Sequence, residues 1–176
     1  MNAADAFEIL ARTPAVLRAL LGGISDGWST HEPDPGWWSA RDVLGHLLHG
    51  ERTDWIPRAT IILEHGESRP FEPFDREGWI SARADKTTAE LLDEFELARA
   101  AGLEALRFME GTDLGARGTH PAFGPVTLGQ LIATWAVHDL NHLGQIVESL
   151  AKRYRDEIGP WRAYLPIVNR PMEDSG

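Results

Sequence analysis

The amino-acid sequence predicts an all-α fold, a four-helix bundle with long connecting loops and a short C-terminal helix. Four segments carry apolar side chains at three- and four-residue spacings, which is the period of an amphipathic helix. Strand patterns are few, and pieces such as Pro125-Val126 are too short to count as strands. The 176 residues contain no internal repeat and no linker long enough to divide two domains, which predicts a single domain over residues 1–176.

The first predicted helix covers residues 3–21, where apolar side chains recur at mixed three- and four-residue spacings. Pro14 removes a backbone N–H, so we expect it to kink or divide this helix. Gly22 and Gly23 should end the helix, because glycine is favoured just beyond a helix C-terminus.

The second predicted helix begins after Ser39 and runs toward Glu64. Ser39 is a favoured N-cap, and Asp42, three residues later, suits the positive end of the helix. Pro57 predicts a kink near the middle. A second irregular stretch, rich in proline and aromatic residues, follows over residues 66–78.

Two capping boxes predict where the third and fourth helices begin. The Thr-x-x-Glu pattern of residues 87–90 opens a helix expected over residues 88–109. The Thr-x-x-Gln pattern of residues 127–130 opens a helix expected over residues 128–154, whose many apolar residues indicate that it is largely buried. A short final helix should start near Pro160, because proline suits the first turn of a helix.

The loop of residues 24–38, ISDGWSTHEPDPGWW, is unusual in holding three tryptophans. We expect these rings to close the end of the core, because tryptophan chiefly contributes buried area. The alternative is that one of them lines the mouth of a pocket.

Charge and composition exclude several classes of function. The chain has 27 acidic and 17 basic side chains, a formal charge of −10, which argues against a nucleic-acid partner because such binding needs Lys and Arg to neutralise phosphates. The local basic group Lys152, Arg153 and Arg155 is expected to complement the negative end of a helix. No leader pattern and no apolar run of ~20 residues is found, so we expect a cytoplasmic protein with no membrane partner.

The pair His138 and His142, in WAVHDLNHLGQI, is the main candidate for metal binding. Residues four apart lie one turn apart on the same face of a helix, so two imidazoles can converge on one ion. The surrounding residues are apolar, and two imidazoles in an apolar helix need partners. A divalent metal would satisfy both, and it would use nitrogen and oxygen ligands because the chain has no cysteine.

The second helix offers a third ligand. His46 lies among apolar residues and His49 follows three residues later. Periodicity alone does not separate the two, and either could instead be a core imidazole hydrogen-bonded to a neighbour. His31, His65 and His120 fall in predicted loops or at a helix end, where a solvated imidazole is the ordinary interpretation, although His120 could close over a pocket.

The sequence resembles the DinB-like superfamily. The resemblance is carried by WWSARDVLGHLLHGERTDW on the second helix, HDLNHLGQI on the fourth, and the late segment YRDEIGPWRAYLPIV. It implies a four-helix bundle of the DinB/YfiT-like type with an unusual connection order, often a homodimer. It also implies one divalent metal ion, zinc or nickel, held by the His of the GHL element, His46, together with His138 and His142.

Three protein ligands leave an open position, as in a catalytic metal site. Some relatives are thiol-dependent transferases or isomerases that use low-molecular-weight thiols, and this resemblance predicts a metal-dependent transferase acting on a small molecule. The alternatives are a metal-dependent hydrolase and a non-catalytic stress protein that binds metal or a small ligand. Asp139 is a candidate base for metal-bound water, although it is one methylene shorter than the Glu of zinc peptidases. Gln145 shares the face of His138 and His142 and could bond to an imidazole or to bound substrate, or equally form an interhelical hydrogen bond. Glu51 is expected at a helix or subunit contact.

Overall fold

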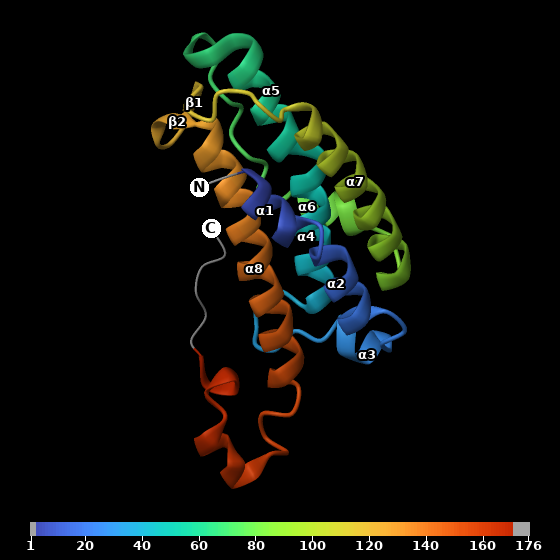
Figure 1. The fold of residues 1–176 in the computed structure, drawn as a ribbon. Helices are drawn as coiled ribbons and strands as arrows, with labels where there is room; N and C mark the ends of the chain where they lie inside the picture. Colours follow the sequence, from blue (N-terminus) through green and yellow to red (C-terminus); the bar gives the residue numbers. More distant parts are fainter. Residues whose placement is uncertain (1–2, 171–176) are drawn as a thin grey trace.

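The structure, a computed structural model, describes residues 3–170, so both ends of the predicted 1–176 domain lie outside it. Four long helical arms pack side by side (Figure 1). This confirms the predicted all-α four-helix bundle. The arms are α1 (Ala3–Leu10) with α2 (Thr13–Leu21), α4 (Ala40–Thr53) with α5 (Trp55–His65), α7 (Thr88–Phe108), and α8 (Leu128–Lys152).

Proline divides the first two arms, as predicted. Pro14 lies in the first turn of α2, where its missing N–H costs no helical hydrogen bond. Pro57 lies in the first turn of α5, and the chain bends at Asp54, which has φ −111° and ψ −68°. Each break therefore falls just before its proline, within a continuous arm of the bundle.

The two predicted capping boxes are present. The hydroxyl of Thr87 accepts from the backbone N–H of Glu90, and Thr127 does the same for Gln130. Ser39 and Asp42 form a third capping box at the start of α4. These three caps fix the starts of the long helices in sequence and space.

The expectation that strands are absent is wrong for one hairpin. β1 (Arg117–His120) pairs antiparallel with β2 (Gly124–Thr127), which contains the Pro125-Val126 piece. The backbone N–H of Phe71 donates to the carbonyl of Thr119 on β1 at 2.9 Å, which adds one hydrogen bond at the edge of the hairpin. Four-residue strands contain too few alternations to be recognised, and this hairpin is stabilised by packing against the end of α5.

Three short elements also differ from prediction. α3 (Asp26–Ser29) and η1 (Gly66–Ser68) form within stretches expected to be irregular, and α6 (Gly78–Arg83) begins where the second stretch ends, over residues for which no helix was predicted. The predicted final α-helix consists of two 3₁₀ turns, η2 (Gly159–Tyr164) and η3 (Pro166–Asn169). Short helices depend on what they pack against, and their sequences have too few residues to show a period.

The core has two apolar clusters, one around α1, α5 and the first half of α8, and the other around α2, α4 and α7. The expectation that α8 is largely buried is only half right, because Val137 and Leu140 are exposed by 63% and 50%. Within residues 3–170, no helix is both long and apolar enough to cross a membrane.

The tryptophan loop closes one end of the bundle, as expected. Lys152 places its Nζ 3.1 Å from the ring centroid of Trp37, and Arg155 pairs with Asp34 at 2.9 Å. Lys152 and Arg155, from the predicted basic group at the end of α8, therefore also bind this loop through their side chains. Trp38 differs from its neighbours, because its ring lies 5.0 Å from that of His46.

Candidate metal centre

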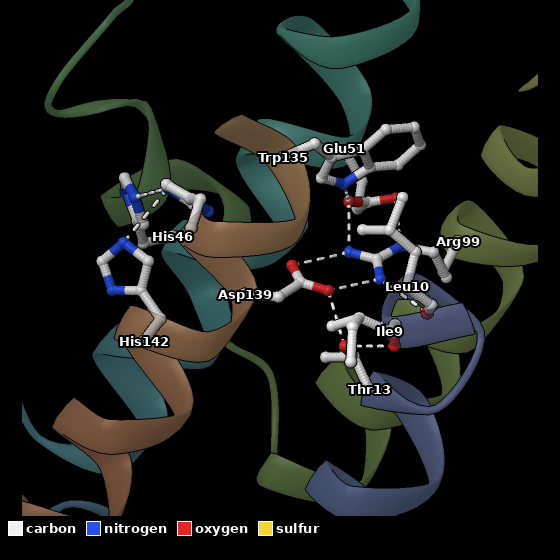
Figure 2. Close-up of polar contacts among 10 residues, drawn as sticks. Ile9, Leu10, Thr13, His46, Glu51, Arg99, Trp135, Asp139 and His142 are labelled. Atoms are coloured by element: carbon white, nitrogen blue, oxygen red, sulfur yellow. Dashed lines mark hydrogen bonds and ion pairs between the residues drawn. The ribbon is translucent and has the colours of Figure 1, made fainter. Parts of the chain in front are cut away.

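His46, His138 and His142 come together at the contact between α4 and α8. The Nε2 atom of His138 lies 3.1 Å from Nε2 of His46 and 3.1 Å from Nε2 of His142. Figure 2 shows the imidazoles of His46 and His142 on the side of α8 opposite Asp139, and the two 3.1 Å contacts place Nε2 of His138 next to both. Among the described residues, these three histidines form a group that could hold a metal ion. Each offers one ring nitrogen, and the three nitrogens lie within 4.8 Å of one another.

These distances fit a metal ion bound by three nitrogens. Ligand nitrogens about 2.05 Å from a tetrahedral ion lie roughly 3.3 Å apart, close to the observed 3.1 Å contacts. Nε2 is the atom that each ring turns into these contacts, so the three rings can present the same nitrogen to one ion.

Proton counting also favours a cation. Nδ1 of His142 lies 2.7 Å from Oε1 of Gln145, so Nδ1 carries the proton and Nε2 presents a lone pair. Nε2 of His138 contacts two nitrogens but can carry only one proton, so only one of the two contacts can be a directed hydrogen bond and the other is left in conflict. A divalent cation bound by all three lone pairs removes this conflict.

The imidazoles are set up as neutral ligands. Burial, together with the charge of neighbouring imidazoles, lowers the pKa of His46 to about 3 and that of His138 to about 2. Burial also lowers the pKa of His142, although the hydrogen bond with Gln145 opposes this. These lowered pKa values favour the neutral imidazole, which is the form that binds metal.

Gln145 supports the site directly. Its amide oxygen accepts the Nδ1 proton of His142, which fixes the tautomer and orientation of that ring. Of the two roles considered for Gln145, contact with an imidazole is the one that the structure shows. By contrast, Nδ1 of His46 and Nδ1 of His138 have no hydrogen-bond partner among the described residues.

Asp139 does not lie at the histidine cluster, contrary to its proposed catalytic role. Both carboxylate oxygens bind Arg99, at 2.6 Å and 2.9 Å, and Oδ2 also accepts from the hydroxyl of Thr13 at 2.6 Å. Figure 2 shows the side chain pointing into the bundle, away from the imidazoles. The physical reason is helix geometry, because adjacent residues project about 100° apart around the axis.

Glu51 lies at a helix contact, as expected. Its carboxylate accepts from Arg99 Nε and Nη2, at 2.9 Å and 2.7 Å, and from the indole N–H of Trp135 at 2.8 Å. Burial raises the pKa of Glu51, and the hydrogen bonds from Arg99 oppose that shift. Glu51 is thus a second carboxylate that does not reach the histidines.

Arg99 is the residue that the sequence analysis missed. It is completely buried, and all five of its N–H groups donate, to Glu51, Asp139 and the carbonyl of Leu10. The signal was its position four residues after Phe95 and seven before Leu106, on the apolar stripe of α7. An arginine in such a stripe indicates buried acidic partners elsewhere in the chain.

The remaining histidines do not join the cluster. Nε2 of His49 lies 3.1 Å from the carbonyl oxygen of Asp75, in the segment before α6. His120 accepts from two backbone N–H groups of the hairpin turn and stacks on Phe123, so it does not close over the three-histidine site. His65 contacts Arg69 at 3.3 Å.

The chain is similar to known proteins in both sequence and fold. A curated relative from Oceanobacillus iheyensis, provisionally named a metal-dependent hydrolase, is 29% identical over 119 residues, which cover 67% of each protein. The fold is similar to that of YfiT from Bacillus subtilis, described as a probable metal-dependent hydrolase with an unusual four-helix bundle topology. That similarity has a TM-score of 0.73 at 20% identity and covers 86% of each chain. The family model of the DinB superfamily matches residues 9–146, most of the bundle, and the protein therefore belongs to the DinB superfamily.

Proposed function

We propose that this protein binds one divalent metal ion, zinc or nickel, through Nε2 of His46, His138 and His142 and acts as a metal-dependent enzyme on a small molecule. The observation that carries the proposal is the convergence of the Nε2 atoms of three buried imidazoles, with Nε2 of His138 at 3.1 Å from each of the other two. A divalent ion held by three imidazoles supplies a Lewis acid with an open position, at which water or a thiol becomes more acidic.

The chain's own residues hold the ligands in place. Gln145 orients His142, and burial keeps the three rings neutral. The rings of Trp38 and Trp55 lie against His46 and His138, each at 5.0 Å, and limit the access of water to the ligands. These features match a preorganised site, whose ligands need little rearrangement on binding.

For the reaction, we propose hydrolysis of a small molecule. The relatives from O. iheyensis and B. subtilis both carry the description of a metal-dependent hydrolase, and three imidazoles with an open position suit the activation of water. Asp139 and Glu51 are both bound to Arg99 and do not reach the histidines. We therefore do not propose a peptidase-like site in which one of these carboxylates acts as the base.

Transfer to or from a small thiol is the second candidate. Among the described residues, the histidine cluster includes no carboxylate that could act as a general base. A thiol needs no such base once its pKa is lowered, so it suits this site. A low-molecular-weight thiol cofactor would supply that nucleophile, because the chain has no cysteine.

The first test is metal content, measured by mass spectrometry on protein purified without a histidine tag. We expect nearly one ion per chain in the wild type and its loss in His46→Ala, His138→Ala and His142→Ala. His65→Ala, which removes a histidine outside the cluster, is the control and should keep its metal. Full metal content in the three cluster variants, or a wild type that cannot be loaded, would overturn the proposal.

A second test separates the two reactions. Hydrolysis predicts turnover of p-nitrophenyl acetate by the metal-loaded protein, lost in His142→Ala. Thiol chemistry predicts instead that 2-mercaptoethanol changes the visible absorption of the cobalt-loaded protein and reacts with an added electrophile faster than in buffer. The homodimer and the cytoplasmic location stay predictions, which light scattering and cell fractionation would check.

A further inference from the structure

Aromatic rings from a segment after α5 lie beside the histidine cluster. In this segment, residues 69–83, the ring of Phe74 meets His46 edge-on at 5.7 Å, and Trp79 contacts Trp38 at 4.9 Å. Trp38 itself lies 5.0 Å from His46. Phe74, Trp38 and Trp79 are each half-buried, and two of them, Phe74 and Trp38, lie against the proposed metal ligand His46.

The segment presents its apolar side inward. Phe71 is buried against the hairpin and Phe74 turns toward His46, while Glu72, Asp75 and Arg76 are exposed. The side of the segment that faces His46 therefore carries an aromatic ring, while its charged side chains face solvent.

His49 holds the segment in place. Its Nε2–H donates to the carbonyl oxygen of Asp75 at 3.1 Å, and its ring lies 5.1 Å from that of Phe74. The imidazole occupies the space that a side chain at position 78 would need, because a Cβ on Gly78 would lie 2.2 Å from Cε1 and 2.3 Å from Nε2 of His49. Gly78 is therefore required for this contact.

A second attachment fixes α6 on α4. Nε of Arg83 lies 2.6 Å from Oδ1 of Asp42, and the guanidinium covers the ring of Trp79. Gly45 allows the close approach, because a Cβ there would lie 3.0 Å from Cβ of Arg83. The segment is thus anchored on both sides of Phe74, at His49 and at Asp42.

We infer that Phe74 and Trp38 determine substrate specificity at the histidine cluster, that they select a molecule with a flat apolar or aromatic group, and that His49 is a positioning residue for Phe74. The inference rests on the proposed metal site, because the reacting part of the substrate would lie at the open position of the ion. Aromatic rings favour such a group through buried area and ring–ring contact.

The test uses two probes that differ by one ring, acetohydroxamate and benzohydroxamate, on the cobalt-loaded protein. Binding of each is followed through the visible absorption of cobalt. We expect benzohydroxamate to bind roughly tenfold more tightly, and Phe74→Ala to remove most of that preference. Phe123→Ala, which removes an exposed ring on the hairpin turn, is the control and should keep the preference.

Variants of His49 separate positioning from a general effect on stability. His49→Gln keeps an N–H donor at a similar reach and should retain the preference for benzohydroxamate. His49→Phe keeps a ring but loses the donor, and it should lower the preference while leaving cobalt affinity unchanged. Gly78→Ala should act like His49→Phe, because its Cβ displaces the imidazole.

The outcomes distinguish this inference from the proposed function. A protein that binds no cobalt, or binds it without the three histidines, contradicts the proposed function. A protein that binds cobalt through them but binds both probes equally, or keeps its preference in Phe74→Ala, contradicts the substrate inference alone. Equal behaviour of His49→Gln and His49→Phe would remove the positioning role of His49.

Discussion

Arg99 and Asp139 are joined by two parallel hydrogen bonds, Nη1 to Oδ2 at 2.6 Å and Nη2 to Oδ1 at 2.9 Å, and both side chains are completely buried. Arg99 is on α7, Asp139 is on α8 next to His138, and Glu51 pairs with Arg99 from α4, five residues after His46. The network therefore joins the two helices that carry the histidines, through a third helix (Figure 2).

Replacing Arg99 should destabilise the fold strongly. Arg99→Met leaves Glu51 and Asp139 buried without their cation, and breaking a buried ion pair in this way costs about 3–5 kcal/mol. The free energy of unfolding, measured by urea denaturation of the metal-free protein, checks this. Arg117→Met removes a half-exposed pair with Glu67, and as a control it should cost less than about 1 kcal/mol. Similar losses in the two variants would show that the buried network contributes little.

Replacing Gln145 should weaken metal binding without removing it. Gln145→Leu removes the acceptor for the Nδ1 proton of His142, and loss of such an outer partner lowers metal affinity about 10–100-fold. Competition with a chromophoric chelator measures the change. Gln145→Glu keeps an acceptor at this position and should restore affinity. An unchanged affinity in Gln145→Leu would mean that His142 is oriented by packing alone.

Acid should destabilise the metal-free protein through the cluster. The pKa values of His46 and His138 are about 3 and 2 in the folded chain, against 6.5 as the ordinary value. Below pH 6.5 the unfolded chain therefore binds protons that the folded chain does not, so stability falls as pH falls. Each such histidine contributes at most about 1.4 kcal/mol per pH unit.

Urea denaturation of chelator-treated protein between pH 7 and pH 5 tests this dependence. His138→Phe should show a shallower loss of stability on acidification than the wild type, by about one proton. His65→Gln, which lacks a histidine outside the cluster, should follow the wild type. Parallel pH profiles for wild type and His138→Phe would contradict the assignment of the pH dependence to the cluster.

Lys152 should hold the C-terminal segment on the bundle. Its Nζ lies 2.7 Å from Oε1 of Glu148, donates to the carbonyl of Arg170 at 3.0 Å and covers the ring of Trp37. Lys152→Met loses these polar contacts, so we expect faster amide hydrogen exchange in residues 153–170, read by mass spectrometry. Lys86→Met breaks an ion pair at the start of α7 and should leave exchange in that segment unchanged. Equal exchange in Lys152→Met and wild type would show that other contacts hold the segment.

Local patterns in the sequence predicted the parts of the fold that local interactions control. The starts of α7 and α8 follow from capping boxes, and the breaks before α2 and α5 follow from Pro14 and Pro57. The hairpin and α6 were missed because they exist through contacts with distant segments.

The sequence by itself determined four helical arms and placed His138 and His142 on one face, because helix period and spacing are properties of adjacent residues. It left His46 and His49 equal on periodicity, and only the resemblance to a known family favoured His46. The tertiary structure decided between them, since α8 packs on the side of α4 that carries His46 while α6 and Gly78 occupy the side of His49. It also decided that Asp139 and Glu51 pair with Arg99, because a charge buried in the core must meet its partners across helices that are far apart in the chain.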